Sequence, residues 1–408
     1  MVNANKFGLI GRTLKHSYSK TIHNLLGDYP YDLYELEPNE LESFIDSGIT
    51  GFNVTIPYKT EIIPLLDQID DAAKEIGAVN TVVIRGGKKI GYNTDFAGME
   101  YMLFSAGISL KDKTVMILGT GGTSKTATAV AKKNGAKEVI IVSRSGQVNY
   151  ENCYDFTGVE VIINTTPVGM FPNSYNKPID ISKFSKLEGV ADVIYNPSLT
   201  ALCNDAKELG LKQVNGLSML VAQAKYAYEK FFDKRIDDVI IEEIYNKIYS
   251  EKINVVLIGM PGSGKSTVGR EVAKQLNREF IDTDEEIVKR AGVDIPTLFK
   301  EKGEAYFRKL ESEVIKDVGK LTGKVIATGG GVVKDILNKY PLHSNGKIFY
   351  IDRKVELLAS EGRPLSKSKE EIIRLYEERK DKYLAFSDVK IENNGKLENA
   401  VKGVINNL

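Results

Sequence analysis

The chain has 408 residues, which is long enough for two or three domains, each with a core of its own. It is 42% hydrophobic and 27% charged, and Lys plus Arg equals Asp plus Glu at 55 each, which favours neither nucleic acid nor an acidic membrane as a partner. The two cysteines, Cys153 and Cys203, form no metal-ligand spacing, and we expect no signal peptide, no membrane span and a cytoplasmic location.

Short apolar runs alternate with helical patterns through the first 100 residues. Runs at 7–10, 31–34, 51–54 and 79–84 have the composition of buried strands. This alternation predicts an α/β fold with mainly parallel sheets.

A second series of strands begins at residues 113–118 and leads into a glycine-rich turn with Gly119, Gly121 and Gly122. Such a turn lets a pyrophosphate approach the N-terminus of the next helix closely. The third position of the fingerprint holds Ser124, which is small enough for close packing. A helix through Asn134 and a strand at 138–142 complete a unit typical of dinucleotide binding.

The end of that second strand indicates which dinucleotide binds. NAD sites usually carry an acid there for the ribose 2′-hydroxyl, whereas this sequence has Arg144 between two serines. An arginine can pair with a 2′-phosphate and stack on adenine, so the sequence favours NADP over NAD. The alternative is that Arg144 is a solvated turn residue.

Hydroxyl and amide side chains border several predicted strands, as expected for a small polyhydroxylated ligand. They fall at 17–19, 53–59, 77–81 and 91–98. Lys59 and Asp95 are the ionisable pair suited to acid/base chemistry, because reduction of a ketone creates an alkoxide that needs a proton. The alternative is a surface salt bridge. His16 and His23 would suit a histidine-based hydroxyacid dehydrogenase, but we assign both to local structure.

These motifs resemble shikimate dehydrogenase over residues 7 to about 249. The matching segments are N-V-T-x-P-x-K at 53–59, G-x-N-T-D at 91–95, and three later signatures at 164–170, 192–195 and 216–223. The resemblance implies that Lys59 and Asp95 are catalytic and that shikimate is bound by Asp95 with Ser17, Ser19, Thr55, Asn80, Tyr195 and Gln223. It also implies an NADP(H) site lined by Gly119, Thr120, Gly121, Gly122, Thr123, Arg144, Val193 and Gly216.

Three positions depart from the family's pattern. Arg12 and Lys20 replace prolines beside the substrate loop, and the loop after Arg144 lacks a second arginine. We expect the first two to alter loop stiffness and the third to loosen cofactor affinity or discrimination.

Residues 259–266, GMPGSGKS, follow an apolar run at 254–258 and precede a helical pattern through Leu276. Strand, loop and helix are the context that the P-loop pattern G-x-x-x-x-G-K-[ST] requires. Its backbone N–H groups can wrap a triphosphate, Lys265 can reach the outer phosphates and Ser266 can hold Mg²⁺. The sequence therefore predicts an ATP site formed by Gly262, Ser263, Gly264, Lys265, Ser266 and Thr267.

Further polar residues follow the P-loop in an order that suits phosphoryl transfer to a hydroxyl group. A predicted strand at 279–284 ends in Asp282, a candidate magnesium ligand, and Asp284, a candidate base. Arg308 and Arg379 could together fork a carboxylate. Three consecutive glycines at 329–331 let the backbone lie against a flat ligand.

These features resemble shikimate kinase over residues 253–408. The D-T-D, G-E-x-x-F-R-x-x-E, G-G-G and R-P-L signatures occur in that order. The resemblance implies that Asp284 is catalytic, that shikimate is bound by Asp284, Arg308, Gly330 and Arg379, and that the lid residue Arg363 meets the ATP phosphates and assists catalysis. Residues 358–362 lack the basic side chain that the family often carries there for adenine.

The sequence thus predicts residues 1–250 as a dehydrogenase and 251–408 as a P-loop kinase, with 1–100 and about 225–250 binding substrate and 101–224 forming a Rossmann domain. The expected reactions are reduction of 3-dehydroshikimate by NADPH and phosphorylation of shikimate by ATP with Mg²⁺. Alternatives are a quinate-type dehydrogenase joined to another small-alcohol kinase, and a nucleotide-gated regulator without catalysis. The sequence does not decide whether the chain forms a homo-oligomer.

Overall fold

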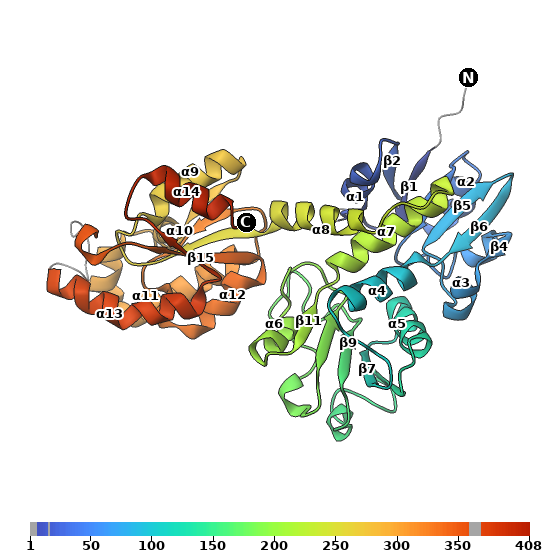
Figure 1. The fold of residues 1–408 in the computed structure, drawn as a ribbon, viewed down its shortest axis with the longest axis horizontal. Helices are drawn as coiled ribbons and strands as arrows, with labels where there is room; N and C mark the ends of the chain where they lie inside the picture. Colours follow the sequence, from blue (N-terminus) through green and yellow to red (C-terminus); the bar gives the residue numbers. More distant parts are fainter. Residues whose placement is uncertain (1–5, 15–16, 359–368) are drawn as a thin grey trace. The chain divides into compact units, whose positions relative to one another are not determined.

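The computed structural model describes residues 6–14, 17–358 and 369–408, so that His16 and Arg363 lie outside the described residues. The chain divides into two compact units (Figure 1). The first comprises Met1–Met170, Asn176–Tyr195 and Leu202–Lys247, and the second comprises Phe171–Tyr175, Asn196–Ala201 and Ile248–Leu408. Within the described ranges, no helix has both the length and the apolar character needed to cross a membrane.

The first unit contains a mixed six-stranded sheet with the order β2–β1–β3–β5–β6–β4. Strand β5 is antiparallel to both β3 and β6, while the other pairs are parallel. The strands are β1 (Phe7–Gly11), β2 (Tyr31–Glu35), β3 (Gly51–Val54), β4 (Gln68–Ile69), β5 (Thr81–Arg85) and β6 (Lys88–Tyr92), with helices α1 (Ser19–Leu26), α2 (Leu41–Ile45) and α3 (Asp71–Ile76) between them.

One strand prediction in this sheet needs correction. The strand predicted at 79–84 begins only at Thr81, as β5. A hairpin then connects β5 to the antiparallel strand β6. Gly86 and Gly87 form the turn with φ angles of 58° and 77°, which match the positive values that the common two-residue hairpin turn requires. Because of this hairpin, the first sheet is not parallel throughout.

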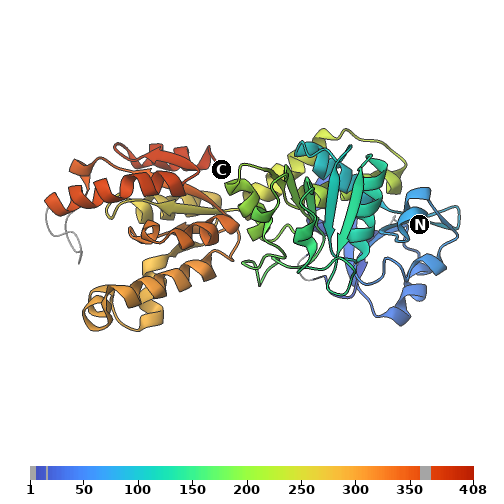
Figure 2. The same cartoon turned by 90° about the horizontal axis from the view of Figure 1, so that it is seen from below.

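The second sheet of the first unit is fully parallel, with the order β11–β10–β9–β7–β8 (Figure 2). Its elements are β7 (Thr114–Leu118), α5 (Gly122–Lys133), β8 (Glu138–Val142), β9 (Val161–Asn164), β10 (Gly189–Asp192), α6 (Ala201–Glu208) and β11 (Lys212–Val214). Alternate residues of β7 enter different cores, with Val115 and Ile117 on one face and Met116 and Leu118 on the other. Because β8 and β9 lie on opposite sides of β7, the turn after β7 opens at a topological switch point, where such sheets bind ligands.

Two helices of the first unit, α4 (Thr94–Ser105) and α7 (Leu217–Phe232), pack closely against each other (Figure 1). Gly98 allows this approach, since a Cβ there would lie 2.8 Å from the carbonyl oxygen of Met219 and 3.0 Å from the Cβ of Gln223. A single missing methyl group therefore fixes the spacing of the two helices.

Helix α8 (Val239–Lys252) leads directly into the first strand of the sheet of the second unit. That sheet is fully parallel with the order β13–β14–β12–β15–β16. Its elements are β12 (Asn254–Ile258), α9 (Lys265–Leu276), β13 (Phe280–Asp282), α10 (Thr283–Ala291), α11 (Ile295–Val318), β14 (Val325–Ala327), α12 (Lys339–Ser344), β15 (Gly346–Asp352), α13 (Lys369–Phe386), β16 (Val389–Glu392) and α14 (Leu397–Ile405).

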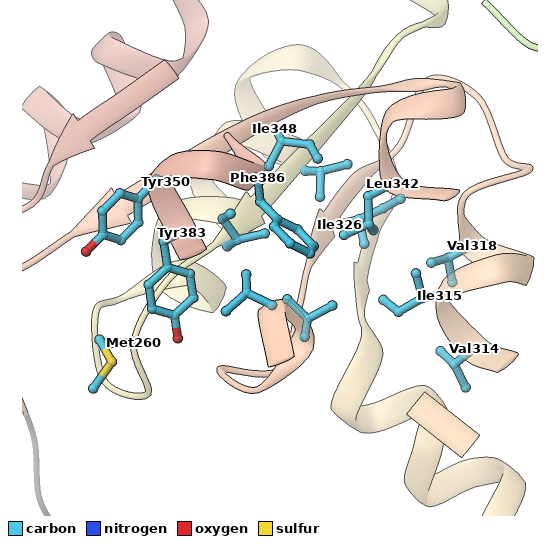
Figure 3. Close-up of a cluster of buried hydrophobic side chains, with 14 of the residues drawn as sticks. Met260, Val314, Ile315, Val318, Ile326, Leu342, Ile348, Tyr350, Tyr383 and Phe386 are labelled. Atoms are coloured by element: carbon cyan, nitrogen blue, oxygen red, sulfur yellow. The ribbon is translucent and has the colours of Figure 1, made fainter. Parts of the chain in front are cut away.

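The central strand β12 is buried on both faces, which explains its uninterrupted apolar run. Val255 and Leu257 pack under α9 and α14, whereas Val256 and Ile258 join the core beneath α11, α12 and α13. Figure 3 shows part of this second core, in which the rings of Tyr350 and the α13 residue Tyr383 stack with centroids 5.1 Å apart. The packing holds α13 against the glycine-rich segment after β14.

Asp284 does not lie on a strand as predicted. Strand β13 ends at Asp282, whose side chain accepts a hydrogen bond from the backbone N–H of Asp284 at 3.0 Å and so caps α10. Strand β14 ends at Ala327, shortly before the glycines at 329–331. Both acids still emerge at the carboxyl end of the sheet, where β14 lies between β13 and the P-loop strand β12.

Candidate functional site

Lys59 and Asp95, predicted as an acid/base pair, form a close ion pair. The distance from Nζ to Oδ2 is 2.6 Å, and the side chains are 21% and 12% exposed. Lys59 lies in the turn after β3 and Asp95 in the first turn of α4. The pair is half-buried and faces a cavity, so water screens its charges less than those of an exposed salt bridge.

Two asparagines fix the start of α4 and therefore the position of Asp95. Asn93 caps the helix by accepting from the N–H of Phe96, and its amide group donates to the carbonyl of Ala78 at 2.9 Å. The side-chain oxygen of Asn80 accepts from the N–H of Thr94 at 2.7 Å. The position of Asp95 therefore depends on hydrogen bonds that the Asn80 and Asn93 side chains make to the backbone.

A buried polar network behind these residues was not predicted. The hydroxyl of Tyr31 donates to the side-chain oxygen of Asn53 at 2.8 Å, and the Asn53 amide donates to the Thr81 hydroxyl at 3.0 Å. The His23 ring stacks on Tyr31 with centroids 3.8 Å apart, and burial lowers the pKa of His23 to about 3. His23 is thus a neutral core residue, in agreement with its assignment to local structure.

The residues predicted for the dehydrogenase line one cavity of about 1020 Å³ in the first unit. The predicted catalytic and substrate residues on its wall are Lys59, Asp95, Ser17, Ser19, Thr55, Asn80, Tyr195 and Gln223. The predicted cofactor residues on its wall are Gly119, Thr120, Gly121, Gly122, Thr123, Arg144, Val193 and Gly216. The cavity is therefore large enough for a small ring beside a nucleotide.

The glycine-rich turn has the backbone that a pyrophosphate site requires. Gly119 has φ of 109°, and a Cβ on it would lie 2.9 Å from the hydroxyl oxygen of Thr165. No atom lies within 4 Å of the positions that Cβ atoms would take on Gly121 and Gly122, so a ligand can approach their backbone. The Ser124 hydroxyl donates to the carbonyl of Gly119 at 2.6 Å, which explains how serine serves at the third position.

The rim of the cofactor side carries Arg144. It is exposed, and its guanidinium makes no ion pair with the residues that the structure describes. Burial raises the pKa of the neighbouring Tyr150, and the Arg144 charge opposes that shift. Across the cavity, a Cβ on Gly216 would lie 2.0 Å from the Val193 carbonyl oxygen, so only glycine fits there. These residues fit a dinucleotide with a negative group near the turn after β8.

The P-loop in the second unit has the geometry of a phosphate cradle. Gly262 and Gly264 have φ of 83° and 93°, and the ammonium of Lys265 donates to the carbonyls of Gly259 and Met260 at 3.0 Å each. The buried hydroxyl of Ser263 has no hydrogen-bond partner. A buried orphan hydroxyl inside such a loop fits an incoming phosphate oxygen.

Ser266 and Asp282 meet at the start of α9. The Ser266 hydroxyl donates to the Asp282 carboxylate at 2.7 Å. No group of three or more His, Cys, Asp or Glu side chains able to hold a metal ion occurs in the described part of the chain. One hydroxyl and one carboxylate fit Mg²⁺, which keeps several waters and phosphate oxygens among its ligands.

Asp284 faces the glycine-rich segment after β14. A Cβ on Gly329 would lie 2.7 Å from a carboxylate oxygen of Asp284 and 3.1 Å from one of Glu311, so the backbone approaches both acids closely. Burial raises the pKa of Asp284, with the nearby Asp282 adding to the shift and Lys265 and Arg308 opposing it. A carboxyl group with a raised pKa suits proton abstraction near neutral pH.

The two arginines predicted to bind a carboxylate are positioned by different contacts. Arg308 donates to the buried Glu311 at 2.6 Å, and a Cβ on Gly331 would lie 2.2 Å from the Arg308 guanidinium. Arg379 is only 4% exposed and donates to the Gly330 carbonyl at 3.0 Å, while its Nε has no hydrogen-bond partner. Asp284, Arg308 and Arg379 thus lie against the glycine-rich segment that contains Gly330.

Sequence reasoning missed Glu311 and Tyr383 as members of this cluster. Glu311 follows Arg308 by three residues on α11, a spacing that could have indicated their ion pair. Tyr383 donates to the carbonyl of Gly330 at 2.5 Å, and no local pattern indicates that contact.

The fold and these two sites define the class of the protein. A parallel dinucleotide-binding sheet beside a lysine–carboxylate pair is the arrangement of an oxidoreductase, and a P-loop beside a buried acid is that of a small-molecule kinase.

Comparison with known proteins identifies the family. The family model for the shikimate dehydrogenase substrate-binding domain matches residues 9–82, and the shikimate kinase model matches residues 261–408. The shikimate dehydrogenase (NADP⁺) of Clostridium perfringens is 37% identical over 264 residues, which span 59% of this chain and 97% of the relative.

Two crystal structures resemble the same part of the chain. One is a chorismate mutase/shikimate 5-dehydrogenase fusion protein from Clostridium acetobutylicum, with 35% identity and a TM-score of 0.58 over 60% of this chain and 98% of its own. The other is a Thermus thermophilus shikimate 5-dehydrogenase in complex with NADP(H) and shikimate, with 26% identity and a TM-score of 0.54 over 60% and 99%.

The chain belongs to the shikimate dehydrogenase family over its first three-fifths and carries a shikimate kinase domain at residues 261–408. Its two activities, shikimate dehydrogenase with NADP and shikimate kinase, are consecutive steps of the shikimate pathway in aromatic amino-acid biosynthesis.

Proposed function

We propose that the Lys59–Asp95 pair performs the proton chemistry of 3-dehydroshikimate reduction. NADPH, when bound, supplies the hydride. Charge then develops on the substrate carbonyl oxygen, and Lys59 donates a proton to it, while Asp95 orients the ammonium group and accepts from a ring hydroxyl. The 2.6 Å contact between the two side chains inside the shared cavity is the observation that supports this assignment.

The remaining cavity residues would hold the ring and the nucleotide. Ser17, Ser19, Thr55, Asn80, Tyr195 and Gln223 supply hydroxyls and amides for a polyhydroxylated ring, and the segment from Gly119 to Thr123 supplies backbone N–H groups for the pyrophosphate. Arg144 would pair with the 2′-phosphate of NADP(H), because its guanidinium has no competing acid among the described residues. Val193 and Gly216 would border the nicotinamide end.

In the kinase half, Asp284 would accept the proton of the shikimate 3-hydroxyl. ATP with Mg²⁺, when bound, supplies the phosphoryl group. Gly262 to Thr267 would wrap the phosphates, with Ser266 and Asp282 holding the ion, and Arg308, Gly330 and Arg379 would bind shikimate, the two arginines at its carboxylate. The Nε of Arg379 is buried and makes no hydrogen bond, with the Glu378 carboxylate 3.9 Å away, and this spare donor supports a ligand at this position. Arg363 is assigned to the ATP phosphates from the sequence alone.

These roles imply a division of labour along the chain. Residues 1–100 and about 225–250 would bind the ring, residues 101–224 the dinucleotide, and residues 251–408 ATP and shikimate. The product of the first reaction is the substrate of the second, so the two sites need the same ring chemistry.

A coupled assay tests the proposal. The purified chain receives dehydroshikimate, NADPH and MgATP together, and shikimate 3-phosphate is measured with NADPH consumption. Parallel reactions with quinate or NAD distinguish a quinate-type enzyme. Absence of phosphorylated product while NADPH is consumed would reject the kinase half alone, and absence of both would reject the bifunctional assignment.

A further inference from the structure

A second cavity, of about 550 Å³, lies in the first unit and takes no part in the reactions described above. Helix α4 contributes Thr94 and Phe96 to its wall, and α7 contributes Lys225. The same two helices place Asp95 and Gln223 in the wall of the dehydrogenase cavity. A ligand in the second cavity therefore contacts the helices that position the dehydrogenase site.

The buried ammonium group of Lys225 is already paired. The side chain is 3% exposed and donates to the carboxylates of Glu229 and Asp238 at 2.7 Å each. Glu229 also accepts from the backbone N–H of Ile236 at 2.9 Å. This cluster ties the segment after α7 to that helix, and its charges need no ligand.

Three other cations line the second cavity without an acidic partner. The Nζ of Lys133 lies 4.7 Å from the ring centroid of Phe96, and the Nζ of Lys230 lies 4.6 Å from that of Tyr92. Arg235 is the third cation, and all three residues are exposed. Among the residues that the structure describes, none forms an ion pair or a side-chain hydrogen bond with these three cations. Their N–H donors are therefore available to a ligand that enters from solvent.

The remaining acids of the cavity wall, Asp70 and Glu100, are engaged. Asp70 caps α3 by accepting from the N–H of Ala73 at 2.8 Å, and Glu100 accepts from the side-chain amide of Asn134 at 2.9 Å. The wall thus offers cationic donors without partners, while its acids already accept hydrogen bonds. Phosphate and carboxylate groups suit such a wall, because Lys and Arg bind them through charge-assisted hydrogen bonds.

We propose that the second cavity binds a small phosphate-bearing anion and that the bound anion inhibits the dehydrogenase. Asn93, which caps α4 and donates to the Ala78 carbonyl, lines this cavity too. An anion there contacts the start of the helix that holds Asp95 2.6 Å from Lys59, and any displacement of Asp95 slows reduction.

Two sources can supply such an anion. The expected product of the kinase half, shikimate 3-phosphate, carries both a phosphate and a carboxylate, and naming it as the ligand rests on the proposed function. Free inorganic phosphate shares the phosphate chemistry but lacks the ring and the carboxylate. Comparison of the two anions therefore distinguishes feedback by the chain's own product from a response to phosphate.

Two double variants separate the cavity from the general charge of the surface. Lys133→Gln with Arg235→Gln removes two of the unpaired cations. Lys132→Gln with Lys234→Gln removes the same charge from exposed neighbours that do not line the cavity. Only the first variant should weaken binding of the anion, by about 3- to 30-fold, since each exposed charge pair contributes up to about fivefold.

Isothermal titration calorimetry of the full-length chain measures binding of each anion, with saturating shikimate present and nucleotide omitted so that both ring sites are occupied. Thermal unfolding checks that each variant is folded. In the NADPH assay, the anion that binds should lower kcat/KM for dehydroshikimate in the wild type and in the Lys132/Lys234 variant. The Lys133/Arg235 variant should match the wild-type rate without the anion and resist the inhibition.

Three results would overturn the proposal while leaving the dehydrogenase assignment intact. They are equal affinities of the two variants for the anion, a dehydrogenase rate that does not respond to it, and inhibition of equal strength in both variants, which would place the anion in the catalytic cavity. A wild-type chain that consumes no NADPH would instead reject the proposed function.

Discussion

Replacement of Lys59 by alanine tests the dehydrogenase mechanism most directly. The ammonium group lies 2.6 Å from Asp95 in a cavity wall, with only 21% of the side chain exposed, so bulk water reaches the reacting oxygen poorly as a substitute proton donor. Loss of a positioned general acid typically costs about 10²–10⁴ in rate. At about 1.4 kcal/mol per tenfold, the barrier should rise by about 3–5 kcal/mol.

The same change also leaves the Asp95 carboxylate without its cation. Because that side chain is only 12% exposed, the dehydrogenase half should lose some stability as well. The expected loss of kcat is therefore measured well below the melting temperature of the variant, by NADPH oxidation at saturating dehydroshikimate. Phosphorylation of added shikimate by the same preparation provides an internal control, since Lys59 belongs to the first unit and the kinase residues to the second.

Two results would refute the reasoning. A kcat within a few-fold of wild type would show that Lys59 is not the proton donor. Equal loss of dehydrogenase and kinase activity would show that the substitution acts through general misfolding or that the two sites are not independent.

Three other substitutions or conditions separate the remaining roles. Arg144→Ala should weaken NADPH binding by about 10- to 150-fold, because a charge-assisted hydrogen bond contributes about 1.5–3 kcal/mol. NADH lacks the 2′-phosphate, so its binding should weaken much less. Equal losses of affinity for both cofactors in fluorescence titration would contradict a 2′-phosphate contact. Arg379→Ala should raise the kinase KM for shikimate by a similar factor, and an unchanged KM would remove it from the carboxylate site. Burial raises the pKa of Asp284, and only its ionised form is a base, so kinase kcat/KM should fall with decreasing pH at values above the ordinary aspartate range. That acid limb should be missing from the residual activity of Asp284→Asn, and an acid limb confined to the ordinary range would contradict the role.

The strands around both nucleotide sites could be predicted from sequence because they are short, mainly apolar runs, although β8, unlike β12, is partly exposed. The runs at 138–142 and 254–258 coincide with β8 and β12 residue for residue. A short apolar segment that ends at a glycine or a polar residue is compatible with few structures other than a strand. Candidate residues next to these strands were also found, because parallel strands bring their carboxyl ends to one edge.

The errors arise where short polar signals were overlooked. Asp282 followed by Asp284 is an N-cap signal that begins α10, and reading it as a strand extended β13 by two residues. Gly86-Gly87 between two alternating segments is a hairpin signal, and recognising it would have predicted the antiparallel pairing of β5 and β6.

Other features depend on contacts between distant segments and have no local signature. The proximity of Asn393 to Gly264 arises from strand order, and the contact of Tyr383 with Gly330 arises from the packing of α13. A single sequence does not encode such distances in any pattern of residue spacing.

The missing methyl group at Gly98 has a consequence for engineering new substrate preferences. One added carbon would push apart the helix that bears Asp95 and the helix that bears Gln223, so a substitution there would alter turnover and ring affinity at once. Mutant libraries should keep this glycine constant and diversify cavity-wall positions such as Thr55, which lies on neither helix. Gly98 thus belongs to the part of the fold that sets the geometry of the site, whereas the cavity wall can be redesigned.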